Sequence, residues 1–199
     1  MLVFTRTPVP GRVKTRLIPA IGAERAANLH QVMLWRTVAT AAEANVGPLA
    51  LWCTPASAHP VFEQLQRNFA LELQVQSGAD LGERMHRALE QALAHAHGAL
   101  LVGIDCPFLQ AQDLREAADA LAAGADAVIG PAEDGGYYLI GVRRSDPAAF
   151  ANIEWGSEGV LVATREKFHA LGWQWRELTT RRDVDRPEDL TALGDRLIY

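Results

Sequence analysis

The sequence has little cysteine, no long apolar run and no excess of positive charge, and each shortage excludes a class of protein. Its two cysteines, Cys53 and Cys106, match no metal-ligand spacing, so we expect free thiols in a reducing compartment. No apolar run reaches the roughly 20 residues of a membrane span. The N-terminus lacks the apolar stretch of a signal peptide, which predicts a cytoplasmic protein. A formal net charge of −5 argues against a general nucleic-acid binder.

We expect the 199 residues to form one domain, residues 1–199, because the sequence contains no repeats, low-complexity tracts or linkers. Short apolar runs bounded by turn residues predict strands at residues 2–5, 49–53, 71–76, 100–104, 127–130, 137–141 and 173–178. Amphipathic stretches predict helices at residues 22–45, 61–69, 81–97, 114–122 and 155–171, with a short terminal helix after residue 187. This alternation of strands and helices predicts an α/β fold with a mainly parallel sheet.

A short apolar run near the middle of the chain ends in an acid and a proline. Residues 100–104 predict a buried parallel strand, with Asp105 at its carboxyl end and Pro107 close behind. Ligands of open α/β sheets bind outside such ends, where a carboxylate can hold a divalent cation that neutralises a phosphate. An Asp close to a proline is also ordinary turn chemistry, so a turn-capping role for Asp105 is the alternative.

The segment after the first strand, residues 6–17, is strongly basic and contains no acid. Two prolines and a glycine rule out a helix over most of it, so irregular backbone can expose its N–H groups. Arginine forks and a lysine charge in such a loop fit a polyphosphate, although Val13 stands where a Walker A loop has glycine. A solvated basic turn is the alternative. The residues that we expect to bind phosphates are Arg6, Gly11, Arg12, Lys14, Thr15 and Arg16.

Two acidic segments follow later in the chain. Residues 133–137, Glu-Asp-Gly-Gly-Tyr, lead into a strand and would bring backbone close to a ligand with carboxylates beside it, or form only a tight turn. Asp183 and Asp185 precede the terminal helix. If the strands before Asp105 and Asp185 are neighbours, both carboxylates emerge at one sheet edge and can share a divalent cation. Alternatively, Asp185 caps the helix and Asp183 bonds locally.

Four motifs together resemble a known protein family. They are Pro-x-Pro-Gly-Arg-x-Lys-Thr-Arg-Leu at residues 8–17, Gly-x-Asp-Cys-Pro at 103–107, Gly-Pro-Ala-Glu-Asp-Gly-Gly-Tyr-Tyr at 130–138 and Arg-Asp-Val-Asp-x-Pro-Glu-Asp-Leu at 182–190. The chain resembles the bacterial glycosyltransferase-like, radical-SAM/selenodomain-associated transferases. More distantly it is similar to the guanylyltransferases of molybdenum-cofactor and 2-phospholactate chemistry. The resemblance implies a three-layer, Rossmann-like nucleotide-diphospho-sugar transferase (GT-A-like) fold with a mainly parallel mixed sheet.

The resemblance also implies roles for individual residues. Lys14, with Arg12 and Arg16, would hold the nucleotide phosphates. Asp105 would bind Mg²⁺ or Mn²⁺ near the α-phosphate, with Asp185 and Asp183 as further metal contacts. No Asp-x-Asp follows the central strand, where typical sugar transferases carry one. The implied catalytic set is Lys14, Asp105 and Asp185, and the implied acceptor side is Glu133, Asp134, Gly135, Gly136 and Tyr137.

The function that we expect is nucleotidyl transfer, in which a phosphorylated small molecule attacks a nucleoside triphosphate and pyrophosphate leaves. The basic loop favours this reaction, because a departing pyrophosphate needs several cations to stabilise it. Two alternatives stay open: a glycosyltransferase that uses a nucleoside diphosphate sugar, and a non-catalytic nucleotide binder. The expected partners are a nucleotide or nucleotide sugar and a small-molecule acceptor, with no nucleic acid and no membrane span.

Overall fold

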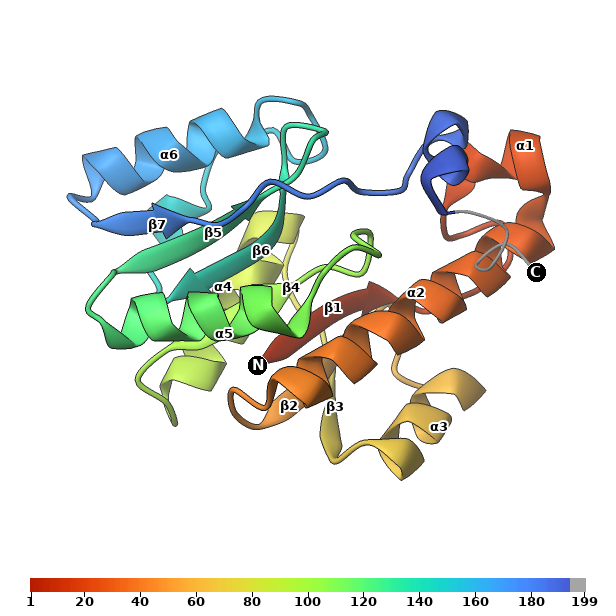
Figure 1. The fold of residues 1–199 in the computed structure, drawn as a ribbon, viewed down its shortest axis with the longest axis horizontal. Coiled ribbons are helices and arrows are strands. Elements are labelled where there is room, and N and C mark those ends of the chain that lie inside the picture. Colours follow the sequence, from red (N-terminus) through yellow and green to blue (C-terminus); the bar gives the residue numbers. More distant parts are fainter. Residues whose placement is uncertain (194–199) are drawn as a thin grey trace.

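A seven-stranded sheet forms the centre of the computed structural model, which describes residues 1–193 (Figure 1). The strands are β1 (Leu2–Arg6), β2 (Leu49–Thr54), β3 (Leu71–Val75), β4 (Ala99–Val102), β5 (Ala127–Pro131), β6 (Tyr137–Val142) and β7 (Trp175–Glu177). Their order across the sheet is β3-β2-β1-β4-β6-β5-β7. Only β6 runs antiparallel to its neighbours, β4 and β5, so the expected mainly parallel mixed sheet is confirmed.

Helices cover both faces of the sheet and give the molecule three layers (Figure 1). One layer holds α2 (Ala23–Ala44), α3 (Pro60–Asn68) and α5 (Ala111–Ala122), and the other holds α4 (Leu81–Leu93) and α6 (Val160–Ala170). Shorter helices are η1 (Thr15–Leu17), α1 (Ile18–Ile21), η2 (Pro147–Ala149) and η3 (Pro187–Leu193). Within residues 1–193, no helix has both the length and the hydropathy that a membrane crossing requires.

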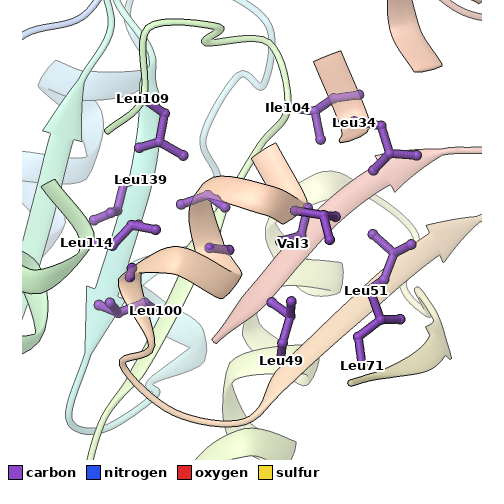
Figure 2. Close-up of a cluster of buried hydrophobic side chains, with 14 of the residues drawn as sticks. Val3, Leu34, Leu49, Leu51, Leu71, Leu100, Ile104, Leu109, Leu114 and Leu139 are labelled. Atoms are coloured by element: carbon purple, nitrogen blue, oxygen red, sulfur yellow. The ribbon is translucent and has the colours of Figure 1, made fainter. Parts of the chain in front are cut away.

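Successive side chains of each central strand alternate between the two helical layers, as the pleat of a strand dictates. On β1, Val3 packs in the cluster of α2, whereas Phe4 packs in the cluster of α4. Figure 2 shows the first cluster, where Val3 and Leu51 of the sheet lie near Leu34 of α2. All four residues of β4 are buried, which is typical of a strand covered on both faces. Ligands of such a sheet bind at the edge where the parallel strands end.

An extended segment, residues 178–186, crosses this edge after β7 and is called the strap here (Figure 1). Its backbone is tied to β5 by the Arg181 N–H, which donates to the Pro131 carbonyl at 3.0 Å, and to the end of β4 by the Val184 N–H, which donates to the Asp105 carbonyl at 2.8 Å. Val184 also packs with Leu17 and the first turns of α2 in a small separate core. The strap therefore joins the last strand to the basic N-terminal loop.

Some expected boundaries are wrong. The helix expected over residues 155–171 begins only at Val160, because Gly156 has φ +87°, which an α-helix does not accept. The helix expected to reach residue 97 ends at Leu93, since residues 94–98 reverse the chain into β4. Strand β4 ends at Val102, so Asp105 lies three residues beyond it. The terminal helix is a 3₁₀ helix.

Candidate functional site

A cavity of about 710 Å³ opens at the edge of the sheet where β1 and β4 end and β6 begins. The basic loop, α2 and the strap line one side of it, and the start of α4, the residues before α6 and the start of β6 line the other. Its volume lies within the roughly 300–1,000 Å³ of pockets that enclose small-molecule ligands. The cavity lies where ligands of open α/β sheets bind, so it is the candidate site.

The ammonium of Lys14 joins three segments that are far apart in the sequence. Its Nζ forms an ion pair with Asp105, donates to the Val184 carbonyl at 2.5 Å and lies 3.8 Å from Oδ1 of Asp185. The Lys14 side chain is only 2% exposed. Its backbone has φ +47° and ψ +42°, a left-handed conformation that residues other than glycine seldom adopt. Lys14 is therefore buried and fully engaged, so the alternative of a solvated turn is wrong for this residue.

The Asp105 carboxylate lines the cavity, and 57% of its side chain is exposed. Burial alone would raise its pKa. The charge and hydrogen bond of Lys14, with smaller contributions from His30 and Arg6, hold the pKa of Asp105 below its ordinary value. Asp105 is therefore ionised at neutral pH and presents negative charge to the cavity.

Asp185 reaches the same place by a different route from the one expected. Strands β5 and β6 separate β7 from β4, so the expectation that neighbouring strands bring the two carboxylates together is wrong. The strap carries Asp185 across the edge, where Oδ2 accepts a 2.5 Å hydrogen bond from Arg16. Because both carboxylates contact one ammonium, their nearest oxygens lie within about 6 Å of each other. Asp189, whose Oδ2 accepts from the Asp185 and Arg186 N–H groups, performs the helix capping instead.

Asp105 can supply one ligand to a divalent cation that takes most of its other ligands from a substrate and water. No group of three or more His, Cys, Asp or Glu side chains in residues 1–193 is arranged to hold a metal ion. The Lys14 ammonium lies between Asp105 and Asp185, at the position where the sequence predicted a shared divalent cation. Mg²⁺ is commonly held by one or two carboxylates together with water and phosphate oxygens, and the exposed Asp105 carboxylate can supply such a ligand.

Asp183 differs from its neighbours in its electrostatics. Burial, then the negative charges of Asp134, Asp189 and Asp105, raises the pKa of Asp183 to about 6. No basic side chain forms an ion pair with Asp183 or Asp134 in the described part of the chain. Both residues line the cavity, so its acidic charge is unbalanced on this side.

The structure brings only part of the expected acceptor side to the cavity. Asp134, Gly136 and Tyr137 line it, whereas Glu133 and Gly135 do not. Asp134 also accepts the Gly136 N–H at 2.8 Å, so it supports the turn as well as facing the cavity. Gly135 has φ +86°, and a Cβ there would lie 2.2 Å from the Glu158 carbonyl, which makes it a packing residue against the start of α6.

The basic loop is divided in the same way. Arg6, Lys14, Thr15 and Arg16 line the cavity, but Gly11 and Arg12 do not. Both of these residues are exposed. They lie in a turn that the Arg12 N–H closes on the Val9 carbonyl at 2.9 Å. The solvated turn that the sequence left as an alternative applies to this part of the loop.

Several cavity residues carry polar or aromatic groups that the sequence reasoning did not select, including His30, Gln76, Arg84 and Trp155. The Nε2 atom of His30 lies 3.0 Å from the Arg6 carbonyl, which places the ring beneath the end of β1, and burial lowers its pKa. Gln76 donates to the Thr5 carbonyl at 3.1 Å and so joins β3 to β1. His30 falls on the apolar stripe of its helix, and a polar residue on a buried stripe was the available signal.

Comparisons with known proteins agree with this architecture. A structure of a candidate nucleotide-diphospho-sugar transferase from Desulfovibrio desulfuricans matches with a TM-score of 0.88 and 33% identity, covering 98% of this chain and 85% of that one. CMP:2-keto-3-deoxy-manno-octonic acid synthetase in complex with CTP matches with a TM-score of 0.59 and 11% identity, covering 96% and 95% of the two chains. A Mycobacterium tuberculosis protein in complex with manganese matches with a TM-score of 0.54 and 18% identity, covering 98% and 97%.

The expected nucleotide-diphospho-sugar transferase fold is confirmed by these structures, whereas the radical-SAM association stays a prediction. No curated protein shows significant sequence similarity to the chain. A family model described as "Uncharacterized protein conserved in bacteria (DUF2064)" matches residues 37–157.

Proposed function

The chain belongs to the bacterial family DUF2064, and on that premise we propose that it is a metal-dependent nucleotidyltransferase. In the proposed reaction, the phosphate of a small-molecule acceptor attacks the α-phosphorus of a nucleoside triphosphate. The bond to the β-phosphate breaks, and pyrophosphate leaves with that electron pair. The observation that carries this proposal is the cluster of Lys14, Asp105, Asp185 and Arg16 at the carboxyl edge of the sheet.

The basic side of the cavity suits the polyphosphate. Arg6 and Arg16 line it, and arginine recognises phosphate oxygens with two parallel hydrogen bonds. The Thr15 hydroxyl lines the same side and can donate a further hydrogen bond. Lys14 holds Asp105 and the strap in place, and it lies close enough to the cavity to place positive charge beside the transferred phosphate.

Asp105, with Asp185 within reach, would hold Mg²⁺ or Mn²⁺ at this point. Such a cation would neutralise charge on the phosphate oxygens during transfer. The chain's own side chains orient the phosphates, because those of the basic loop and of the strap line one side of the cavity. The synthetase of similar fold that binds CTP supports a nucleotide in this place, and the manganese complex supports a divalent cation.

Sugar transfer from a nucleoside diphosphate sugar is the second candidate. The observation that favours it is the 33% identical relative, which bears the name of a candidate nucleotide-diphospho-sugar transferase. The three positive side chains of the basic side, Arg6, Lys14 and Arg16, favour nucleotidyl transfer, because a triphosphate carries more charge than a sugar diphosphate.

Pyrophosphate release is the deciding measurement. The protein is incubated with each of the four nucleoside triphosphates, a panel of phosphorylated acceptors and Mg²⁺ or Mn²⁺. We expect pyrophosphate from at least one pair, with a loss of about 10²-fold or more in Asp105→Asn. Asp119→Asn, an exposed acid on α5 outside the cavity, is the matched control and should keep full activity. Turnover of nucleotide sugars alone would establish the second candidate. Nucleotide binding without any turnover would overturn both candidates and indicate a non-catalytic nucleotide-binding protein.

A further inference from the structure

The side of the cavity opposite the basic loop carries an apolar surface. Five side chains form it, and together they are called the apolar wall here: Leu81 and Met85 of α4, Tyr137 of β6, Trp155, and Val160 of α6. Leu81 is 42% exposed although it is a large apolar residue. Tyr137 and Trp155 are partly exposed, whereas Met85 and Val160 are buried, so Leu81 and the two rings give the cavity its apolar surface. Such a surface inside a ligand cavity is typical of a subsite for an apolar group.

The apolar wall is already assembled. The rings of Tyr137 and Trp155 meet edge to face, with centroids 6.4 Å apart and planes at 88°. Trp155 also lies against Gly82, where a Cβ would approach the indole to 2.7 Å, so the absence of a side chain at Gly82 seats the ring. The Tyr137 hydroxyl lies 4.0 Å from the sulfur of Met85. A preformed surface of this kind binds a ligand without first having to order its own side chains.

The charges of the cavity indicate which part of a substrate occupies the apolar wall. Lys14 and Arg16 are on the other side, where a triphosphate finds its counter-charges. Asp134 and Asp183 have no ion-pair partners in residues 1–193, and they repel a triphosphate from their side more strongly than a phosphate monoester, which carries less negative charge. Asp134 lies three residues before Tyr137, so this repulsion acts beside the apolar wall.

Arg84 supplies a cation beside the apolar wall. It lies on α4 between Leu81 and Met85 and lines the cavity. Its Nε donates to the Gly78 carbonyl at 3.1 Å, and its guanidinium forms no ion pair with any residue from 1 to 193. A guanidinium without an anionic partner, next to an apolar surface, fits a phosphate joined to an apolar group.

We propose that the apolar wall and Arg84 bind the acceptor, and that the acceptor is a phosphate ester of an apolar ring or hydrocarbon rather than of a sugar. The identification of the occupant as the acceptor rests on the proposed nucleotidyl transfer. The apolar chemistry of the subsite rests on its residues alone. The expected preference is about tenfold or more, because a ring that leaves water for this surface buries apolar area on both sides.

Binding of three simple phosphates tests the proposal. Phenyl phosphate, glucose 1-phosphate and inorganic phosphate are titrated by calorimetry into the full chain, with tripolyphosphate present to occupy the basic side. We expect phenyl phosphate to bind at least about tenfold more tightly than the other two. Leu81→Asp should remove that preference, whereas Val162→Asp should keep it. Val162 is a matched control, because it is 55% exposed on α6 and does not line the cavity.

Two further variants separate the parts of the subsite. Arg84→Met should weaken all three phosphates by a similar factor and leave their ratio unchanged. Trp155→Ala should lower the preference for phenyl phosphate. Because this variant removes a packed ring, its melting temperature is measured as well, and the exposed Leu81 position provides the same test if Trp155→Ala does not fold.

The outcomes distinguish this inference from the proposed function. Equal binding of the three probes would overturn the apolar subsite even if pyrophosphate release were observed. If Leu81→Asp weakened nucleoside triphosphates as much as phenyl phosphate, the apolar wall would hold the base, and the assignment to the acceptor would be overturned. A clear preference for phenyl phosphate without pyrophosphate release from any triphosphate would overturn the proposed nucleotidyl transfer and support the apolar subsite.

Discussion

Removal of the Lys14 ammonium tests the central arrangement of the site most directly. The variant is Lys14→Met, which keeps the length of the side chain and removes its charge. The Val184 carbonyl then loses its donor, and Asp105 and Asp185 lose the cation between them. Lys167→Met is the matched control, because the sequence contains only these two lysines and Lys167 lies near the end of α6.

Two effects set the size of the expected loss. A hydrogen bond from a charged donor contributes about 1.5–3 kcal/mol to stability. Two carboxylates about 6 Å apart repel by roughly 1–3 kcal/mol between water and an effective dielectric constant of 20, and the exposure of Asp105 favours the lower end. We therefore expect Lys14→Met to lower the free energy of unfolding by about 2–4 kcal/mol near pH 8.

The dependence on pH follows from the pKa of Asp105. In the wild type this pKa lies below its unfolded value, so the ion pair stabilises the fold above that value and is lost as the pH falls through the folded pKa. In Lys14→Met, mutual repulsion raises the carboxylate pKa values instead, so the variant loses stability as the pH rises. The difference between the two proteins should be largest at pH 8 and smaller at pH 4, because the carboxylates of the variant take up protons first and no longer repel each other; the wild-type ion pair is lost only at pH values below the ordinary pKa of Asp105.

Urea unfolding at pH 4, 6 and 8 measures this difference, and Mn²⁺ titration of the folded protein provides a second reading. Without the ammonium, the carboxylates should bind Mn²⁺ about tenfold more tightly, which corresponds to a change of about 1.4 kcal/mol. A loss of stability that did not change with pH, or unchanged Mn²⁺ affinity, would show that Lys14 does not neutralise these carboxylates.

Three further variants probe the surroundings of the site. Burial and neighbouring carboxylates raise the pKa of Asp183 to about 6, so its charge destabilises the fold above that pH. Urea unfolding of Asp183→Asn should give the same free energy of unfolding as the wild type near pH 4, and a value about 1–2 kcal/mol higher at pH 8. Gly135→Ala should lower stability by about 2 kcal/mol or more, because the new Cβ would meet the chain before α6, and an unchanged melting temperature would contradict this packing. Arg181→Met should cost about 3 kcal/mol by leaving Asp113 charged and buried, and Asp113→Asn in the same protein should recover part of the loss.

The sheet and its helices could be predicted because their signals are local. Strand β4 is apolar throughout and α4 has an apolar stripe, so each indicates its own type of structure. Asp80 and Glu83 predict the start of α4, and the Glu83 N–H does donate to Asp80 at 2.8 Å. The start of α6 could not be predicted, because only the tertiary structure places Gly156 at positive φ.

The sequence could predict which types of residue form the site, but not which of them contact one another. A basic loop and an acid after the central strand indicated phosphate and cation chemistry, and the cavity does contain Lys14 and Asp105. Their pairing, and the arrival of Asp185, depend on the strap, whose course is set by packing of Val184 against Leu17 in the small third core. Contacts over 80 or more residues leave no periodicity in the sequence, and therefore no local pattern could indicate them.

The engagement of Lys14 with Asp105 also constrains how any phosphate can bind. The ammonium already has contacts with Asp105, Val184 and Asp185, so a phosphate that recruits Lys14 must weaken at least one of them. Weakening the Val184 contact loosens the strap, while weakening the Asp105 contact leaves a carboxylate that binds a divalent cation more strongly. Occupancy of the basic side and of the cation position are therefore coupled through one side chain. A phosphate that binds at the basic side should consequently raise the affinity of the protein for the cation, and by linkage the cation should raise the affinity for the phosphate by the same factor.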